Sequence, residues 1–415
     1  MKLLNHKKIC IDCRFWGLEH TGLGRYTMKL VTELAKLDHQ NQYYLLLKKR
    51  HLSTVNYQLK TKNFIPIPTD TRHYTLKEQI TISKILQSIK PDIFHIPHFN
   101  IPIFYKLCSS KTKLIVTIHD LIKHSSVGSE TTTLSKPVYW FKLAAYHLVF
   151  NQAIFQSSAI IVPSNFVKNQ LIANFHIPET KIHVTYEAPD PIYYQETKKQ
   201  ASQKTINQLL KTYNLQSKSY LIYTGNVYPH KNLTNLIKAF CLLCHPGLDP
   251  GSPWYQNQPR RILKQVQNDK ITLAIVCSRS VFRTRVENYA KQLNIQPHIK
   301  FLGYVPDEDL RELYRHSIAF ITPSLIEGFG LPGLEAMAAG TPVLAANASC
   351  LPEIYQNYAI FFNPMDPLDI SQKITRVISL KENQKTKLIN QASQYSHTFS
   401  WTKMANQTLN IYQLT

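Results

Sequence analysis

Short apolar segments alternate with helix-forming segments along this chain, and the pattern occurs twice. In the first half, the strand-like segments are bounded by polar residues or proline and cover residues 8–15, 42–49, 92–97, 113–120 and 159–164. The second set covers residues 220–226, 271–277, 299–305, 319–324 and 341–347. Apolar strands separated by helices form parallel sheets with helices on both faces. We therefore predict an α/β protein of two doubly wound, Rossmann-like domains.

A polar, proline-containing segment, residues 187–200, separates the two sets. The chain has 415 residues, more than a single hydrophobic core usually supports. We predict an N-terminal domain over residues 1–190 and a C-terminal domain over residues 200–395. Residues 245–269 interrupt the second set with four prolines and no helical or strand period, although such connections normally take a few residues. We interpret this stretch as a surface insertion without a catalytic role, and a partner-binding loop is the alternative.

The chain is basic throughout. It has 48 Lys and Arg against 26 Asp and Glu, a formal charge of +22, and the excess is spread over both halves. Compositional bias of an A/T-rich genome and attraction to an anionic membrane both fit this distribution, and no nucleic-acid partner is expected. No segment approaches the ~18 apolar residues of a membrane span, and the N-terminus lacks the apolar stretch of a signal peptide. We expect a cytoplasmic protein.

Two of the cysteine pairs have the CxxC spacing of a zinc site, Cys10/Cys13 and Cys241/Cys244. The first pair lies in a predicted strand, where side chains three positions apart point to opposite faces. The second pair lies in the other half of the chain. We therefore predict reduced, structural thiols and no metal site.

Glycines gather in one short segment. Of the twelve in the chain, four lie after the strand-like residues 319–324, namely Gly328, Gly330, Gly333 and Gly340. A helix-forming sequence, LEAMAA, follows the first three. A strand, a glycine turn and a helix N-terminus bind anions, because free N–H groups and the helix dipole face the ligand.

Two carboxylates flank this glycine turn. Glu327 lies at the carboxyl end of the strand, and we expect Glu335 in the first helical turn. Both can reach one ligand, and a carboxylate accepts hydrogen bonds from two ribose or sugar hydroxyls. The alternative for Glu335 is a charge that complements the helix dipole.

The sequence resembles the retaining glycosyltransferases of family 4, whose GT-B fold has two Rossmann-like domains with a cleft between them. The E-x7-E signature of that family matches EGFGLPGLE at residues 327–335. Further similar segments are GLGRYT (22–27), FHIPHFNIP (94–102), TIHDL (117–121), VPSNF (162–166), YTGNVYPHKNLTNLIKAF (223–240) and FSWTKMANQTLNIY (399–412). The resemblance excludes residues 245–269 and points to a mannosyltransferase-like subgroup. It implies an acceptor-side N-terminal domain, a C-terminal domain that binds the nucleotide-sugar, and a last helix (396–415) that crosses back to the N-terminal domain.

The resemblance also implies donor-binding roles. Lys231 is similar to the lysine that neutralises the leaving nucleotide diphosphate, and Asn226 holds a position where the family often has arginine. Glu335 resembles the residue that holds the ribose hydroxyls, and Glu327 the one near the donor sugar and phosphate. The backbone amides implied to contact phosphate and sugar belong to Phe329, Gly330 and Leu331.

In the first half, the resemblance implies three further residues. His119 resembles the active-site histidine that faces the donor sugar, and a histidine that caps a strand end is the alternative. Gly22 and Gly24 would let the acceptor and the donor phosphate approach the backbone. The implied catalytic residues are His119, Glu327 and Lys231.

Two features bear on whether the donor site is intact and metal-free. Cys277 ends a strand where the family usually has glycine. Asp307 and Asp309 form a DxD pattern, the metal motif of transferases with another fold. However, they lie in a sequence typical of a helix start, where acidic residues complement the dipole.

The implied reaction moves a sugar from a nucleotide-diphospho-sugar, with GDP-mannose favoured, to a hydroxyl group with retention at the anomeric carbon. The acceptor would be an envelope polysaccharide, such as lipopolysaccharide, or a lipid-linked saccharide. Lys231 and the turn amides would stabilise the leaving diphosphate, so no metal or other cofactor is expected.

A peripheral contact with an anionic membrane is a further expectation. The aromatic helix predicted over residues 137–156 and its flanks supply basic and aromatic side chains for it, namely Lys136, Tyr139, Trp140, Lys142 and Tyr146. The alternative is that these aromatic residues pack in the core.

Two other classes of protein stay open. A dinucleotide-dependent oxidoreductase would need the third glycine of GxGxxG, which GLGRYT lacks. The insertion and Cys277 suggest the second class, a non-enzymatic or degraded transferase-like protein, such as a basic protein that binds anionic surfaces. The presence of Lys231, Glu327 and Glu335 argues against degradation.

Overall fold

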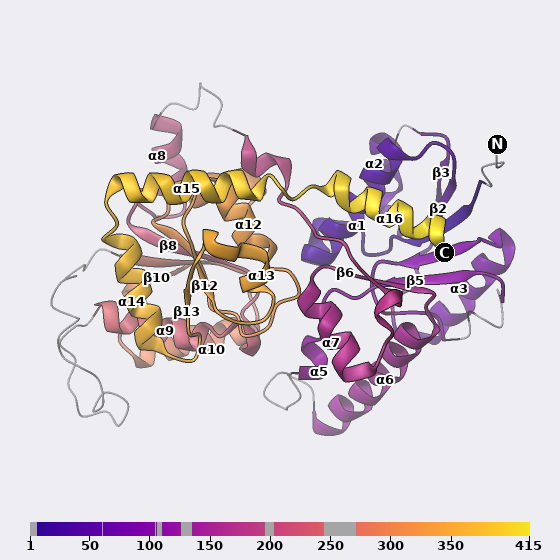
Figure 1. The fold of residues 1–415 in the computed structure, drawn as a ribbon. Coiled ribbons are helices and arrows are strands. Elements are labelled where there is room, and N and C mark those ends of the chain that lie inside the picture. Colours follow the sequence, from indigo (N-terminus) through magenta and orange to yellow (C-terminus); the bar gives the residue numbers. More distant parts are fainter. Residues whose placement is uncertain are drawn as a thin grey trace. The chain divides into compact units, whose positions relative to one another are not determined.

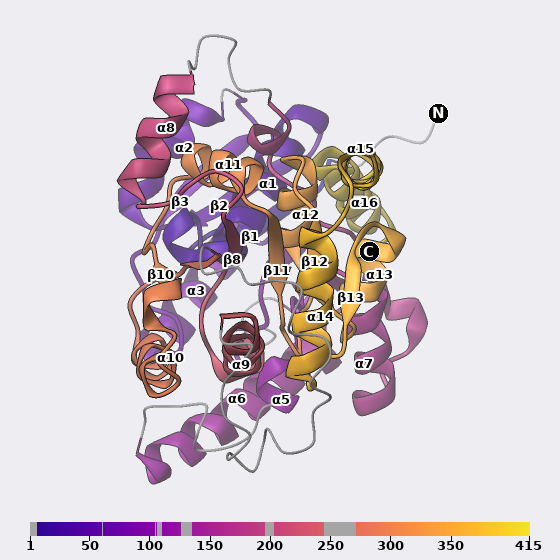
Figure 2. The same ribbon diagram turned by 90° about the vertical axis from the view of Figure 1, so that its left-hand side faces the viewer.

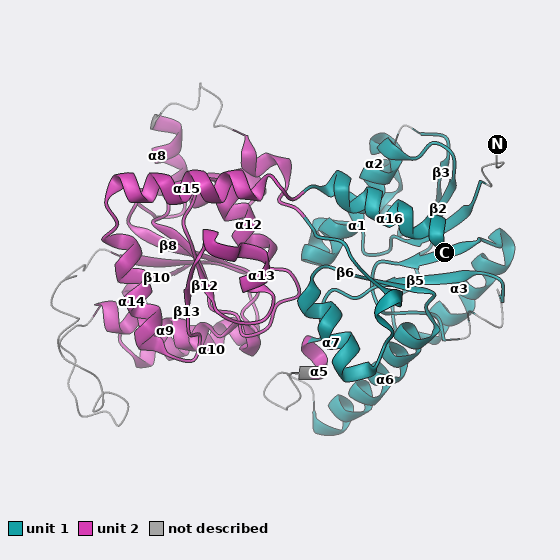
Figure 3. Cartoon of the chain, viewed as in Figure 1, with its two compact units in different colours: residues 1–121, 134–187, 400–415 teal, residues 122–133, 188–399 magenta. Residues whose placement is uncertain are grey.

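A computed structural model describes residues 6–415 apart from 60, 104, 106–109, 126–134, 196–202 and 245–270. The predicted insertion, residues 245–269, lies outside the described residues. The chain forms two compact units, shown in different colours in Figure 3. The first unit comprises Met1–Leu121, Leu134–Glu187 and Ser400–Thr415, and the second comprises Ile122–Thr133 and Ala188–Phe399.

The first unit contains a seven-stranded sheet in which all neighbouring strands are parallel. The strand order is β3-β2-β1-β4-β5-β6-β7, so the winding direction reverses between β1 and β4. The strands are β1 (Lys8–Asp12), β2 (Gln42–Leu47), β3 (Phe64–Pro68), β4 (Ile93–Ile96), β5 (Lys113–Thr117), β6 (Ala159–Val162) and β7 (Ile182–Val184).

Helices cover this sheet (Figure 1). The described helices are α1 (Thr21–Leu37), α2 (Leu52–Gln58), α3 (Leu76–Ile89), α6 (Lys136–Gln156), α7 (Asn165–Phe175) and α16 (Trp401–Leu414), with 3-10 turns η1 (Leu18–His20), η2 (Lys49–His51) and η4 (Glu179–Lys181). The side chain of Thr75 caps α3 by accepting a hydrogen bond from the N–H of Glu78. The helix ends at Ile89, because Pro91 disfavours helical backbone at Lys90. The last helix, α16, packs along α1.

The second unit contains a six-stranded sheet, also parallel, in the order β10-β9-β8-β11-β12-β13. Its winding direction reverses between β8 and β11. The strands are β8 (Tyr220–Thr224), β9 (Thr272–Val276), β10 (Ile299–Phe301), β11 (Ala319–Thr322), β12 (Val343–Ala346) and β13 (Ile360–Phe362). Two doubly wound α/β units, as predicted from the sequence, are therefore confirmed.

Two layers of helices enclose the second sheet. Figure 2 shows α9, α10 and α14 on one face of the sheet and α11 and α12 on the other. In agreement with this, α9 packs on α10 and α14, and α12 packs on α11 and α15. The described helices are α5 (Ile122–Ser125), α8 (Gln203–Thr212), α9 (Leu233–Cys244), α10 (Val281–Gln292), α11 (Asp307–His316), α12 (Leu331–Ala338), α13 (Leu351–Tyr355), α14 (Pro367–Ile378) and α15 (Glu382–Ser396). The 3-10 turns are η5 (Pro191–Tyr194), η6 (Pro229–Lys231), η8 (Gln296–His298) and η9 (Gln356–Tyr358).

Three strands were missed in the sequence, namely β3, β7 and β13, and all three lie at a sheet edge. Edge strands are only partly buried, so they lack the continuous apolar run of a central strand. In β3, Pro66 and Pro68 also remove backbone donors, which an edge strand tolerates.

One side of α6 belongs to the core of the first unit. Tyr146, Phe150 and Ile154 pack with apolar residues of β4, β5 and β6. The expectation that Tyr146 contacts a membrane is therefore wrong, because its ring packs against Phe99 and Phe150. Trp140 remains 58% exposed. None of the helices in the described part of the chain is both long enough and apolar enough to cross a membrane.

Candidate functional site

The glycine turn lies between β11 and α12, at the carboxyl end of a central strand. Gly330 immediately precedes α12 with φ 87°, a left-handed conformation that favours glycine. In the part of the chain that the structure describes, no side chain caps this helix. The N–H groups in the first turn of α12 therefore lie at the carboxyl ends of the strands, where doubly wound proteins bind ligands.

Tyr355, the last residue of α13, contacts this glycine turn. Its buried hydroxyl donates a hydrogen bond of 2.5 Å to the carbonyl oxygen of Gly330. A Cβ atom at Gly333 would lie 2.2 Å from Tyr355 Oη, and one at Gly330 would lie 2.7 Å from it. Burial raises the pKa of Tyr355, so the hydroxyl stays protonated as a donor. No sequence pattern marks Tyr355, because its role depends on packing alone.

Lys231 and Glu327 meet across the switch point of the second sheet. Nζ of Lys231 lies 2.6 Å from Oε1 of Glu327, and the side chains are 14% and 18% exposed. Lys231 ends η6 in the connection after β8, whereas Glu327 follows β11, the neighbouring strand. The N–H of Glu327 also donates to Oγ of Ser349 at 3.1 Å.

The residues beside Lys231 fix its loop. The N–H of Leu325 donates to the carbonyl oxygen of His230 at 2.8 Å. The amide of Asn232 donates to the carbonyl oxygens of Pro323 and Pro364 at 3.1 and 2.8 Å. Burial, and then the charge of Lys231, lower the pKa of His230 to about 4, so its imidazole is neutral near pH 7. Sequence reasoning missed these contacts.

Glu335 is buried, with 5% of its surface exposed. It is the fifth residue of α12, and no acidic residue lies in the first turn of that helix. The expectation that Glu335 lies in the first turn is therefore wrong. An end-of-helix charge effect falls off within one turn, which weakens the dipole explanation for this carboxylate.

The remaining donor-side residues lie around the same strand ends. Phe329 is buried, and its ring centroid lies 6.0 Å from that of Phe399. Leu331, the first residue of α12, is half-buried. Asn226 is exposed after β8, and its backbone carbonyl oxygen accepts a 2.5 Å hydrogen bond from Tyr223. Cys277, just after β9, is buried, and burial raises its pKa to about 11.

His119 lies in the first unit, after β5. Its Nε2 lies 3.2 Å from the carbonyl oxygen of Pro97, and its Nδ1 lies 3.4 Å from Oε1 of Glu187. A carbonyl oxygen only accepts, so the Nε2 contact requires a proton on that nitrogen. The ring also meets Tyr26 edge-on, with centroids 4.7 Å apart. Glu187 was not singled out for this role, because it lies at the start of the polar linker segment.

A buried chain of hydrogen bonds lies next to His119. Nδ1 of His95 lies 2.6 Å from the hydroxyl of Tyr412 in α16, and its Nε2 lies 3.0 Å from Oγ1 of Thr117. Tyr26 Oη lies 3.4 Å from the same Thr117 oxygen. Burial, and then His119, lower the pKa of His95 to about 3. This network joins α16 to the strands that carry His119.

Gly22 and Gly24 lie in the first turn of α1 rather than in a loop. A Cβ atom at Gly24 would lie 1.9 Å from the carbonyl oxygen of Gly17, so packing alone requires glycine there. Among the described residues, no atom outside the adjoining residues and the backbone of α1 lies within 4 Å of a Cβ built at Gly22. The backbone at Gly22 is therefore open to a ligand.

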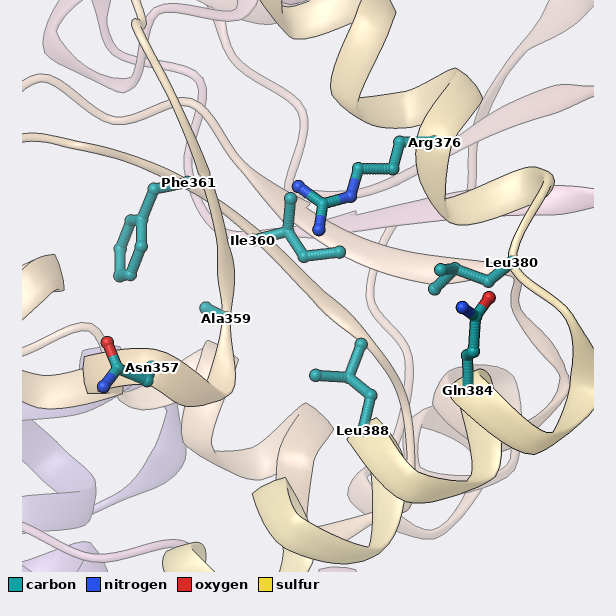
Figure 4. Close-up of a pocket in the computed structure, with 8 residues that line it drawn as sticks. All are labelled: Asn357, Ala359, Ile360, Phe361, Arg376, Leu380, Gln384 and Leu388. Atoms are coloured by element: carbon teal, nitrogen blue, oxygen red, sulfur yellow. The ribbon is translucent and has the colours of Figure 1, made fainter.

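A pocket of about 390 Å³ lies elsewhere in the second unit (Figure 4). It is bounded by β13, α14 and α15, and the Arg376 side chain extends over Ile360. None of the predicted site residues lines it. Among the residues that the structure describes, no three His, Cys, Asp or Glu side chains are grouped to hold a metal ion, and the described cysteines are free thiols.

Comparisons with known proteins identify similar chains. O-antigen chain mannosyltransferase B of Escherichia coli is 27% identical, over 95% of this chain and 96% of that protein. The O-antigen chain mannosyltransferase RfbU of Salmonella typhimurium is 20% identical, over 88% of this chain and 90% of that protein.

Solved structures show the same fold. A glycosyltransferase from Rickettsia africae superposes with a TM-score of 0.71 at 19% identity, covering 99% of this chain and 98% of that one. Anabaena Alr3699/HepE, solved with UDP and glucose, gives a TM-score of 0.71 at 15% identity, covering 99% and 100%.

Two family models match successive parts of the sequence. The model described as Glycosyltransferase Family 4 matches residues 20–191, and the model described as Glycosyl transferases group 1 matches residues 205–395. The first match covers the strands of the first sheet except β1, and the second match covers all strands of the second sheet. The chain is therefore an enzyme of the GT-B fold that belongs to the family 4 glycosyltransferases.

Proposed function

We propose that this glycosyltransferase moves a sugar, with mannose favoured, from a nucleotide-diphospho-sugar to a hydroxyl of an envelope polysaccharide or lipid-linked saccharide. We propose further that it retains the anomeric configuration and needs no metal. Two relatives that cover most of the chain are named as O-antigen mannosyltransferases, which supports the sugar and the acceptor class. The observation that carries the proposal is the contact of Lys231 with Glu327 beside the glycine turn.

Lys231 is proposed to neutralise the donor diphosphate. When the glycosidic bond breaks, negative charge grows on the diphosphate, and a fixed ammonium group stabilises the transition state more than the ground state. Glu327 holds this ammonium group in place at 2.6 Å. A bound diphosphate would share it, and Glu327 could then accept a hydrogen bond from a sugar hydroxyl.

The turn before α12 is proposed to bind the phosphates through backbone amides. Gly330 and Leu331 contribute the start of the helix, where N–H groups lack intrahelical acceptors. Phe329 precedes them and is fixed by burial. These donors and Lys231 would supply the charge stabilisation that a divalent metal gives other transferases, so EDTA should leave the rate unchanged.

Glu335 is proposed to bind the ribose hydroxyls, since a carboxylate can accept from both. His119 is proposed to contact the donor sugar, a role that rests on the family resemblance. Its contacts with Pro97 and Glu187 fix the ring orientation. Attack would come from the same face as the departing diphosphate, with no covalent enzyme intermediate.

The enzyme is proposed to work at the cytoplasmic face of the membrane. The exposed side of α6 carries Trp140 and Phe141, which are 58% and 76% exposed, with Lys136 and Lys142 beside them. No acidic residue occurs in this helix. A basic, aromatic helix face favours contact with anionic lipids.

Thermal melting with UDP, GDP, ADP and their sugar conjugates tests the donor site. A ligand at 100 times its dissociation constant adds about 2.7 kcal/mol to stability. One nucleotide should raise the midpoint in the wild type and in Glu308→Gln, an exposed control, but not in Glu335→Gln. Transfer to a lipid-linked saccharide, measured with and without EDTA, then tests the reaction. If no nucleotide raises the midpoint, the proposed donor site is contradicted.

A further inference from the structure

Basic side chains surround one carboxylate at the carboxyl ends of β1 and β2. Oε1 of Glu19 in η1 lies 2.5 Å from Nη2 of Arg50 and 3.2 Å from Nε2 of His51, both in η2. Nε2 of His20 lies 3.9 Å from the same oxygen. Nζ of Lys48 lies 3.3 Å from that nitrogen of His20. We call these five residues the basic cluster.

The basic cluster carries excess positive charge. Lys48 and Arg50 are cations, and Glu19 is the carboxylate among them. Partial burial, and then Arg50, lower the pKa of Lys48. Partial burial, and then Lys48, lower the pKa of His20. Partial burial lowers the pKa of His51, with Glu19 opposing and Arg50 adding to this effect. Burial is the largest cause of these three shifts, and the neighbouring cations add to it, so the single carboxylate is outnumbered by cationic groups.

Nearby carboxylates have other partners. Asp70 accepts a hydrogen bond from the N–H of Lys49, and its Oδ2 lies 3.8 Å from Nζ of that lysine. Asp12 forms a buried ion pair with Arg14, with Oδ2 and Nη2 2.5 Å apart. Because Asp70 and Asp12 have these partners, Glu19 is the carboxylate that, among the described residues, contacts the basic side chains of the cluster.

Aromatic rings adjoin the basic cluster at the switch point between β1 and β4. The centroid of Phe15 lies 5.2 Å from that of His20, 4.0 Å from His73, on which it stacks, and 5.3 Å from His98. Nε2 of His73 is buried, with no hydrogen-bond partner among the described residues. Burial lowers the pKa of His73 to about 4, so the ring is neutral. A buried polar atom without a partner is costly unless a ligand completes it.

We propose that the basic cluster binds a phosphate group of the acceptor, and that Nε2 of His73 bonds a hydroxyl of the adjoining sugar. Phosphate carries about −1.5 to −2 charges and several acceptor oxygens, which matches cationic donors better than a carboxylate does. Doubly wound sheets bind ligands at the carboxyl ends of their strands, at the switch point. That the phosphate belongs to the acceptor rests on the proposed function, but the binding of phosphate at this site does not.

Glu19 acts as an internal competitor for the phosphate. Its carboxylate folds over Gly17, where a Cβ atom would lie 2.1 Å from Oε2 of Glu19. The side chain is 44% exposed, so it can turn toward solvent when an anion enters. Removing its charge should therefore strengthen phosphate binding.

Pyrophosphate is the probe, because it carries phosphate charge without a nucleotide or lipid. Its binding is measured by calorimetry on the full chain with Lys231→Ala, which removes the proposed donor-phosphate contact. Arg50→Gln should weaken binding about tenfold, and Glu19→Gln should strengthen it about three- to tenfold. Lys49→Gln, which removes the same charge one residue away, should change it less than about twofold.

Equal losses in Arg50→Gln and Lys49→Gln, or unchanged or weaker binding in Glu19→Gln, would overturn the proposal. A hexose 1-phosphate and a short polyprenyl diphosphate then distinguish a free sugar phosphate from a lipid-linked acceptor. Tighter binding of either one, lost in Arg50→Gln, supports the proposal, and binding of neither contradicts it. If pyrophosphate binds while no nucleotide raises the melting midpoint, the proposed function fails and this site stands.

Discussion

Nζ of Lys231 lies 2.6 Å from Oε1 of Glu327, although 96 positions separate the two residues in the sequence. They follow β8 and β11, which are neighbours in the sheet because its winding reverses between them. This contact brings a cation and a carboxylate to the same edge as the glycine turn. It is the geometry from which the donor-phosphate role of Lys231 is proposed.

Replacing Lys231 tests that role directly. Lys231→Ala should lower the rate of sugar transfer by about 10²–10³, the usual cost of losing one contact that stabilises developing charge. Lys211→Ala, an exposed lysine of α8, should leave the rate unchanged. Steady-state kinetics over a range of donor concentrations separate the effect on kcat from that on KM. Full activity of Lys231→Ala would remove this residue from the mechanism.

Gly22 separates function from stability. Gly22→Ala places a methyl group in open space in the first turn of α1. The free energy of unfolding should therefore stay the same or rise by about 0.5–1 kcal/mol, and the melting midpoint should not fall. Transfer should fall if a substrate approaches this backbone. Gly24→Ala is the contrast, because its Cβ would overlap the carbonyl oxygen of Gly17 and destabilise the unit. Unchanged transfer in Gly22→Ala would contradict the predicted role.

Tyr355 should control the shape of the glycine turn. Tyr355→Phe removes the donor to the Gly330 carbonyl oxygen and should cost about 1–3 kcal/mol of stability, because a buried acceptor loses its partner. Nucleotide binding should weaken with it. Tyr304→Phe, whose ring is 75% exposed, is the matched control and should change neither quantity. Calorimetric binding and thermal melting measure both effects.

His95 should make the first unit sensitive to acid. Its pKa is about 3 in the folded chain against an ordinary value of 6.5, so only the unfolded state takes up the proton between these values. Stability should therefore fall as pH decreases from about 6.5, by roughly 2 kcal/mol at pH 5 from this residue alone.

His95→Gln should flatten that pH dependence, whereas His39→Gln, at an exposed position, should not. Urea unfolding at pH 7 and pH 5 measures the difference. An equal loss of stability in wild type and His95→Gln would refute the assignment.

The exposed face of α6 should bind anionic vesicles. Replacing Trp140 and Phe141 together by serine should lower vesicle binding about tenfold or more, because two large apolar groups no longer leave water. Tyr57→Ser, at a position 80% exposed on α2, is the control. Sedimentation with phosphatidylglycerol vesicles at two salt concentrations measures the binding. Equal sedimentation of all three proteins would argue against docking through α6.

Every central strand of the two described sheets was predicted from the sequence, whereas of their four edge strands only β10 was, within residues 299–305. β6, for example, is an unbroken apolar segment because helices cover both of its faces. β7 and β13 are three residues long and partly exposed, so their sequences resemble loops. Tyr146 shows the same limit within a helix. The aromatic residues of α6 look alike in the sequence, and only packing divides them between core and surface.

The sequence by itself determined the order of the central strands, the helices between them and the glycine turn at Gly330. These features are local, since backbone preference and apolar pattern act over a few residues. Tertiary structure alone decided which distant groups meet, including Lys231 with Glu327, His119 with Glu187 and Tyr355 with Gly330. Such contacts depend on strand order and on the packing of helices, which bring together residues that no spacing in the sequence relates.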